Sequence, residues 1–309
     1  MKACRLFSVL VVALSIVVFM WNSGSVRAQS TASDWEKAAG APLPLDTASV
    51  QLTSDPGPGH CWGTGPLGPL SNDGVGTHGF AFGYSNCSVS DYIEFAYKLW
   101  LTPSQKQSLD AQLPSWAITD RFNIYLKGPG RTSKDKKRVT MQSLLADRFK
   151  LSVHFETREM PVFALVPLIP GEPAPKLIPR PEGVPCPTHW VDLPEDVPTA
   201  CGIFGGGPGD GRGSIFGRGV TMAEIAKALT QQDSGIPRPI LDQTGLTGKY
   251  DFYIVFTPNS PNYSPEYLRK MGGPTLEEAL RDQLGLKIEA TRGSVDVLVI
   301  GRIEKPTLN

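Results

Sequence analysis

Three chemistry-bearing side chains alternate along one predicted strand near the middle of the chain. His154, Glu156 and Arg158 lie two residues apart, so an extended backbone would place all three on one face. An imidazole beside a carboxylate can transfer a proton, and a guanidinium can bind an anionic ligand. These three residues form the candidate ligand-binding site. An ordinary solvent-facing strand with alternating charges is the alternative.

A glycine-rich run at residues 201–219, CGIFGGGPGDGRGSIFGRG, is the second candidate. It ends where a helix is predicted, and free N–H groups at a helix start can bind phosphate. A P-loop, however, needs Lys and then Ser or Thr directly after its last glycine, and Arg218 is flanked by glycines here. We therefore expect a flexible loop. Weak anion binding by Arg212 and Arg218 is the alternative.

Familiar catalytic motifs are missing from the sequence. It contains no G-x-S-x-G nucleophile elbow and no H-E-x-x-H zinc-binding helix. The four histidines are scattered, and no two cysteines have C-x-x-C spacing, so we expect neither a metal nor another cofactor. Acidic and basic residues balance at 30 each, which gives no reason to expect nucleic-acid binding. The most basic stretch, RTSKDKKR at 131–138, is expected to be a solvated loop.

The N-terminus predicts export. Two basic residues precede an apolar run from Leu6 to Trp21, and small residues follow at the positions before a cleavage point after Ala28. Residues 1–28 are therefore a predicted signal peptide, and the mature chain is expected to be periplasmic or secreted. The alternative is that this segment is not cleaved, in which case it would be the only contact with the membrane. Its apolar run of 16 residues is short for a membrane span of about 20.

Four cysteines remain after removal of the signal peptide. An even number in an exported chain predicts disulfide bonds. We expect the pairs Cys61–Cys87 and Cys186–Cys201, because each closes a short loop. Closing loops of this size contributes about 3 kcal/mol each in the chain-entropy model. The other two connectivities stay open.

One segment of the chain occurs twice, with an offset of 135 residues and no gap. Residues 140–165 contain thirteen apolar residues, and twelve of their counterparts in residues 275–300 are also apolar. Average composition would give about half. Each copy begins with apolar residues at helical spacing, continues with an alternating strand and ends with a buried strand.

The similarity extends upstream of this segment. Alternating strands are predicted at 121–128 (RFNIYLKG) and 249–256 (KYDFYIVF), and a capped helix precedes each. Short strands, GFAF (79–82) and SIFG (214–217), come before the helices. We therefore predict an α+β fold of two sequence-related helix-on-sheet repeats, each with the order helix–strand–helix–strand–strand.

The predicted domain boundaries follow from the repeats. The first α+β repeat is expected at 29–166 and the second at 199–309, with a proline-rich connector at 167–198. The connector has ten prolines in 32 positions, which excludes helix and central strand. One pseudo-symmetric domain with a shared sheet is the alternative.

Several motifs resemble a known family. RFNIYLKG, LLADRFKLSVHFETREMPVFALV, RPILDQTGLTGKYDF, LRDQLGLKIEA and VDVLVIGRIEKP are similar to an uncharacterised exported family of soil bacteria, domain of unknown function 3738. DTASVQL (46–52) resembles its opening strand, whereas DAQLPSW (110–116) replaces its usual glycine-rich segment. Relatives occur joined to membrane antirepressors of the β-lactam-sensor type, which implies a sensing or interaction role. The resemblance supplies no catalytic residues.

Taken together, these features predict an exported, non-enzymatic binding or interaction module that takes part in envelope sensing. Its expected partner is an unidentified envelope protein or a small ligand. The alternative is an extracytoplasmic hydrolase with an unrecognised active site, in which His154 and Glu156 act as the acid–base pair. A purely structural envelope protein is the third hypothesis.

Overall fold

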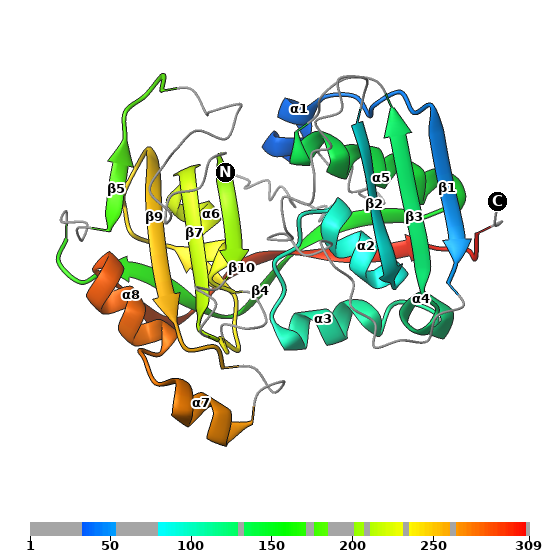
Figure 1. Cartoon of the computed structure of the whole chain (residues 1–309). Helices are drawn as coiled ribbons and strands as arrows, with labels where there is room; N and C mark the ends of the chain where they lie inside the picture. Colours follow the sequence, from blue (N-terminus) through cyan, green and yellow to red (C-terminus); the bar gives the residue numbers. More distant parts are fainter. Residues whose placement is uncertain are drawn as a thin grey trace, which may run out of the picture.

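The structure is a computed structural model of the chain, and it describes residues 33–53, 80–128, 133–170, 176–184, 201–206, 211–230, 235–259 and 264–306. Two lobes are present, each an antiparallel sheet with helices on one face, and two long strands connect them (Figure 1). The α+β fold class predicted from the sequence is therefore confirmed.

The first lobe comes before residue 150, and the second lies between residues 176 and 285. The first lobe consists of α1 (Asp34–Ala39), β1 (Thr47–Leu52), β2 (Phe80–Cys87), α2 (Val89–Ala96), α3 (Pro103–Asp110), α4 (Ser115–Thr119), β3 (Phe122–Gly128) and α5 (Lys134–Arg148). The second lobe contains β5 (Leu177–Arg180), β6 (Gly202–Gly206), β7 (Gly213–Val220), α6 (Met222–Ala228), β9 (Lys249–Phe256), α7 (Pro265–Met271) and α8 (Leu276–Leu284). The connecting sheet is built from β4 (Ser152–Pro167), β8 (Ile240–Asp242) and β10 (Leu286–Arg302).

The first lobe packs α2 and α5 on a sheet of order β1–β3–β2. Alternate residues of β3 are buried, as the predicted strand requires: Phe122, Ile124 and Leu126 face the helices, and Tyr125 faces away. The apolar face predicted for the 140–149 helix is also confirmed. Its four members are buried, namely Met141, Leu144, Leu145 and Phe149.

The second lobe repeats this arrangement with a sheet of order β5–β9–β7–β6 and helices α6 and α8. Strand β9 buries alternate residues, from Tyr250 to Phe256. Strand β5 lies inside the predicted proline-rich connector and contains Pro179. It is an edge strand, where a residue without an N–H is tolerated because one side needs no partner.

Several helices begin at the capping residues that their sequences contain. Ser88, Thr221 and Thr275 cap three helices: each hydroxyl accepts a hydrogen bond from the backbone N–H three residues on, and the acidic side chain at that position accepts one from the N–H of the cap. Such boxes satisfy N–H groups that have no partner within the helix. The caps begin α2, α6 and α8.

Strands β4 and β10 pair antiparallel along their whole length, from Leu286 opposite Pro167 to Arg302 opposite Ser152. The prediction of two consecutive strands at the end of each repeat is therefore wrong. Each pair of predicted strands is one continuous strand, because a cross-strand partner is present at almost every position and no turn interrupts the ladder.

The connecting strands contribute to both hydrophobic cores. Phe155 of β4 lies opposite Leu298 of β10, and both pack against the first core. Leu165 lies opposite Ile288, and both pack against the second core. The last strand of the chain therefore completes the core of the first lobe.

The glycine-rich run is the first of two segments that differ from their predicted structure. The predicted strand at 214–217 is confirmed as part of β7, but the flexible loop expected for the run is wrong, because its described part forms the antiparallel strands β6 and β7. Aromatic neighbours explain the glycines: a Cβ at Gly217 would lie 2.4 Å from the Phe252 ring. Gly219 has a φ of +62°, a conformation that glycine adopts without strain.

The basic stretch at 131–138 is the second segment that differs from its predicted structure. Helix α5 begins at Lys134 within the expected solvated loop, with Ser133 as its cap. Arg138 is buried because its guanidinium pairs with Asp135 and lies 5.7 Å from the centre of the Phe95 ring. A paired cation can be buried where a free one cannot, and composition alone does not reveal the pair.

Several predictions fall on residues outside the described ranges. The signal peptide, Cys61 and Cys186 lie there, so export and the disulfide pairing stay predictions. Cys87 and Cys201 are both described, and neither is a free thiol. Among the described residues, no helix is long and apolar enough to span a membrane.

Candidate functional site

The residues of the predicted ligand-binding site are neighbours on β4. His154 Nε2 lies 3.2 Å from Glu156 Oε1, and Arg158 Nη2 donates to Glu156 Oε2 at 2.8 Å. The three side chains are 36%, 44% and 52% exposed, in chain order. The structure therefore brings the predicted residues together as one row on an open strand.

Electrostatics show what this row can do. The hydrogen bond from Arg158, followed by the contact with His154, holds the pKa of Glu156 below its usual value. The carboxylate therefore stays ionised at neutral pH and is a poor proton donor. Across the ladder, Val297 lies opposite Glu156, so an apolar row borders the charged one. Whether the row binds a ligand stays a prediction.

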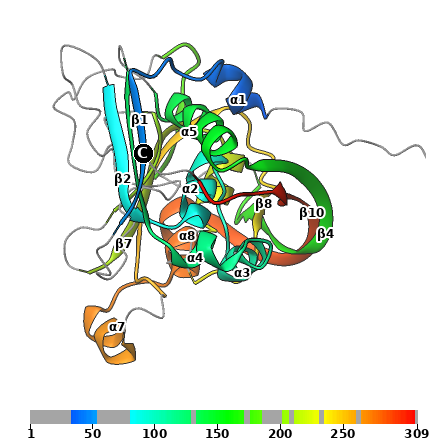
Figure 2. The same ribbon diagram turned by 90° about the vertical axis from the view of Figure 1, so that its right-hand side faces the viewer.

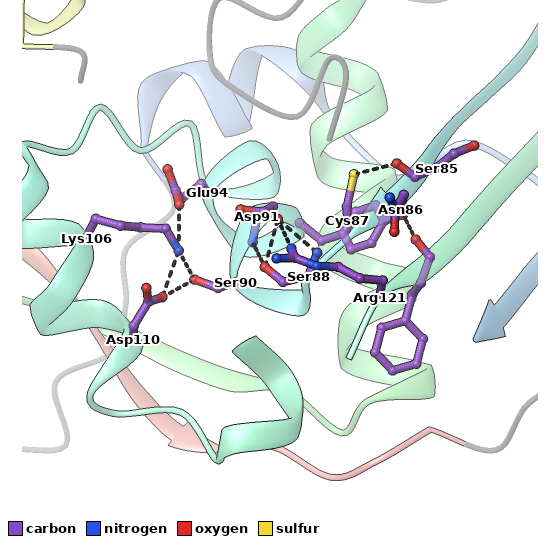
Figure 3. Close-up of polar contacts among 12 residues, drawn as sticks. Ser85, Asn86, Cys87, Ser88, Ser90, Asp91, Glu94, Lys106, Asp110 and Arg121 are labelled. Atoms are coloured by element: carbon purple, nitrogen blue, oxygen red, sulfur yellow. Dashed lines mark hydrogen bonds and ion pairs between the residues drawn. The ribbon is translucent and has the colours of Figure 1, made fainter. Parts of the chain in front are cut away.

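A second cluster, which the sequence did not predict, connects α2 to α3 (Figure 3). Ser90 and Glu94 lie one turn apart on α2, and Lys106 and Asp110 lie one turn apart on α3. The Lys106 ammonium lies 3.0 Å from Glu94 Oε1 and 2.7 Å from Asp110 Oδ1. It also donates to the Ser90 hydroxyl, which in turn donates to Asp110. We call these four residues the α2–α3 cluster.

Burial changes the titration of this cluster. Ser90 is fully buried, and the Glu94 side chain is only 13% exposed. Desolvation raises the pKa of Glu94 to about 7; Lys106 opposes that rise, and the charges of Asp91 and Asp110 add to it. Burial alone would lower the pKa of Lys106, but its carboxylate partners raise it, Glu94 first.

A third cluster surrounds Asp251 on β9. Its carboxylate accepts from Arg180 Nη1 at 2.9 Å and from the Gly219 backbone N–H at 2.7 Å. Arg218 Nε lies 3.7 Å away. Arg218 is one of the two arginines considered for anion binding, and its charge is thus already close to a carboxylate. The cluster joins the strands β5, β7 and β9.

Comparison with known proteins identifies the family. The model of a family described as "protein of unknown function (DUF3738)" matches residues 90–303. The chain belongs to this family. No curated protein and no solved structure matches it. The DUF3738 match begins at Ser90 and contains the α2–α3 cluster and the β4 row, whereas β1 precedes it.

The α2–α3 cluster of this DUF3738 chain is not arranged as a catalytic dyad. A serine nucleophile activated by lysine needs a neutral amine and access for a substrate. Lys106 has a raised pKa between two carboxylates, and Ser90 has no exposed surface. What the geometry does provide is a cross-link between two short helices, with one carboxyl group that titrates near neutral pH.

The sequence patterns did not reveal this cluster, because α3 was not among the predicted helices. A signal was present: Thr102 with Gln105 forms a capping box, and Pro103 occupies the first helical position. Helical spacing would then have placed Lys106 and Asp110 on one face. In the described part of the chain, no group of three or more His, Cys, Asp or Glu side chains could hold a metal ion.

Proposed function

We propose that the chain is an exported, non-enzymatic binding or interaction module, and that the two sheet faces that no described helix covers form the interaction surface. The predicted signal peptide supports export to the periplasm or the medium. The expected partner is an envelope protein, with a small ligand as the other class. Membrane contact is proposed only through an uncleaved signal segment, and nucleic acid is not an expected partner.

The arrangement of the sheets supports this proposal. Both sheets lie on one side of the molecule, α2, α5, α8 and the β4–β10 ribbon lie on the other, and α7 lies below the sheets (Figure 2). Tyr125, in the central strand of the first sheet, is 49% exposed on the face that no helix in the described part of the chain covers. An exposed tyrosine offers a large apolar surface and a hydroxyl at little entropic cost, which suits a partner interface. This tyrosine is the observation that carries the proposal.

The second sheet contributes further apolar surface. Phe216 of β7 and Tyr253 of β9 are cross-strand neighbours on its outer face, with ring centres 6.1 Å apart. Ile178 of the edge strand β5 lies on the same face and is 57% exposed. Aromatic residues on a flat sheet face are common at the centres of protein interfaces.

Affinity capture tests the proposal. The tagged mature chain would be recovered from its own cell envelope after mild crosslinking, and the retained proteins quantified by mass spectrometry. We expect one partner near equal molar amount with the wild type, and at least a tenfold loss with Tyr125→Arg. Tyr267→Arg is the matched control, because Tyr267 is similarly exposed but lies on α7. Equal capture by both variants contradicts the proposed surface.

The hydrolase alternative rests on one contact, the 3.2 Å approach of His154 to Glu156. A general acid–base role would make both His154→Ala and Glu156→Ala inactive while their stability stays unchanged. Activity screens against ester, amide and glycoside substrates would decide. A robust activity that either substitution abolishes would replace the interaction proposal.

A further inference from the structure

We propose that Glu94, Lys106 and Asp110 form a proton-dependent clamp that holds α3 on α2, firmly in acid and more loosely above neutral pH. The device is a property of the first lobe and does not depend on the proposed interaction surface. It concerns a short segment, Pro103–Leu113, that enters the core through Leu109 and Leu113 only. With so few buried apolar contacts, the polar cluster is a large part of what fixes α3.

The clamp has a buried carboxylate at its centre. Glu94 faces Lys106 and Asp110 from α3 and Asp91 from its own helix. Asp91 is paired with Arg121 at 3.3 Å, so the excess negative charge comes from the two carboxylates, Glu94 and Asp110, that share the single cation Lys106. Protonation of Glu94 removes one negative charge, and the hydrogen bonds that join Ser90 of α2 to Lys106 and Asp110 of α3 remain. Acid therefore relieves repulsion without breaking the cross-link.

The direction of the effect follows from linkage. The pKa of Glu94 is about 7 with α3 in place, and moving α3 away would return it toward the ordinary value of 4.5. A carboxyl group with a raised pKa favours the packed form below 4.5, and this preference declines as the pH rises to 7. Between pH 5.5 and 8.0, the open fraction should rise on the order of twentyfold.

Opening of α3 would also uncover part of β10. Gln112, just beyond α3, accepts from the Ile300 N–H at 3.0 Å and donates to the Leu298 carbonyl at 3.3 Å. The counterparts of Leu298 and Ile300, 135 residues earlier, are Phe163 and Leu165 of β4. At those two positions the edge of β4 is covered by the strand β8. Gln112 thus covers a strand edge that could otherwise pair with an extended segment. The clamp controls whether this edge is covered.

Hydrogen–deuterium exchange tests the clamp directly. Protection would be measured for peptides within 103–113 and for the Ile300 amide at pH 5.5 and 8.0, with labelling times corrected for intrinsic exchange. In the wild type we expect protection at both places to fall about tenfold or more at the higher pH. Glu94→Gln, which mimics the protonated group, should change less than about twofold. Glu277→Gln is the control, since Glu277 is exposed on α8.

Either of two results would overturn the proposal. One is wild-type protection that is equal at the two pH values, and the other is a Glu94→Gln variant that keeps the wild-type change. A carbon-13 titration of the Glu94 carboxyl group in the wild-type chain gives an independent answer that needs no variant. A midpoint near 7 supports the clamp, and a midpoint below 5 contradicts it.

Discussion

Glu159 of β4 lies directly opposite Ser294 of β10, and the Ser294 hydroxyl donates to the Glu159 carboxylate. The two residues are 135 positions apart, which is the offset of the sequence repeat. If two copies of one unit are related by a two-fold axis, the axis passes where a residue meets its own counterpart. The pairing supports a duplication about this point, although the duplication itself stays a prediction.

A cut between the lobes should not separate them. Leu298 of β10 is buried in the first core, and Leu165 of β4 in the second, so each side of the cut retains a strand that the other needs. We would insert a protease site within residues 171–175 and cleave the folded chain under reducing conditions. The fragments should co-elute at the size of the intact chain. Elution as two separate species would show that the β4–β10 ribbon contributes little to holding the two fragments together.

Removal of the central cation of the α2–α3 cluster should be costly. Lys106→Met leaves the nearly buried carboxyl group of Glu94 and the partly buried one of Asp110 without their cation, and we expect the free energy of unfolding to fall by about 3 kcal/mol. Lys305→Met is the control: Lys305 Nζ lies 2.8 Å from Asp120 Oδ2, but its side chain is 57% exposed. That change should cost less than about 1 kcal/mol. Urea denaturation of both variants checks the difference, and equal losses would contradict a structural role for the cluster.

The titration of Glu94 should also appear in global stability. Because its pKa is raised to about 7, its contribution to the unfolding free energy decreases as the pH rises from 4.5 to 7 and is constant above that. The decrease should be on the order of 1 to 3 kcal/mol. Glu94→Gln should remove this part of the pH dependence and be more stable than the wild type at pH 8. Denaturation midpoints from pH 5 to 8 provide the measurement.

The cysteines give a prediction that is independent of the clusters. Cys87 is fully buried at the end of β2, and Cys201 lies next to β6 in the other lobe. We expect the mature chain to contain no free thiol, with the bonds Cys61–Cys87 and Cys186–Cys201. Mass spectrometry of a non-reduced digest identifies the pairs. A bond from Cys61 or Cys87 to either of the other two cysteines would refute the local pairing.

Much of the fold follows from local patterns in the sequence. Alternation in 121–128 and 249–256, helical spacing in 140–149 and the caps at Ser88 and Thr221 predicted elements that the structure contains, because each pattern reports a buried face or a satisfied helix end. The continuity of β4 was not predictable in this way. It depends on pairing with β10, and such a partner is distant in the sequence.

The candidate sites differ in the same way, since one depends on a local pattern and the other on packing between elements. The row at His154 was predictable because alternation within one strand places its members together. The α2–α3 cluster was not, since it requires the packing of two helices whose facing residues are sixteen positions apart, as in the Ser90–Lys106 contact. The glycine-rich run was misinterpreted for a related reason: Gly217 is needed by the Phe252 ring on a neighbouring strand.

The most direct test of the interaction proposal is photo-crosslinking in the native envelope. A photoreactive phenylalanine analogue would replace Tyr125 in the full chain, and the same analogue at Tyr267 would serve as the control. We predict one discrete adduct of constant mass from position 125, and at least tenfold less of this adduct from the control position. Equal adducts from both positions, or none from position 125 although the variant is exported and folded, would contradict the assignment of the sheet faces as the interaction surface.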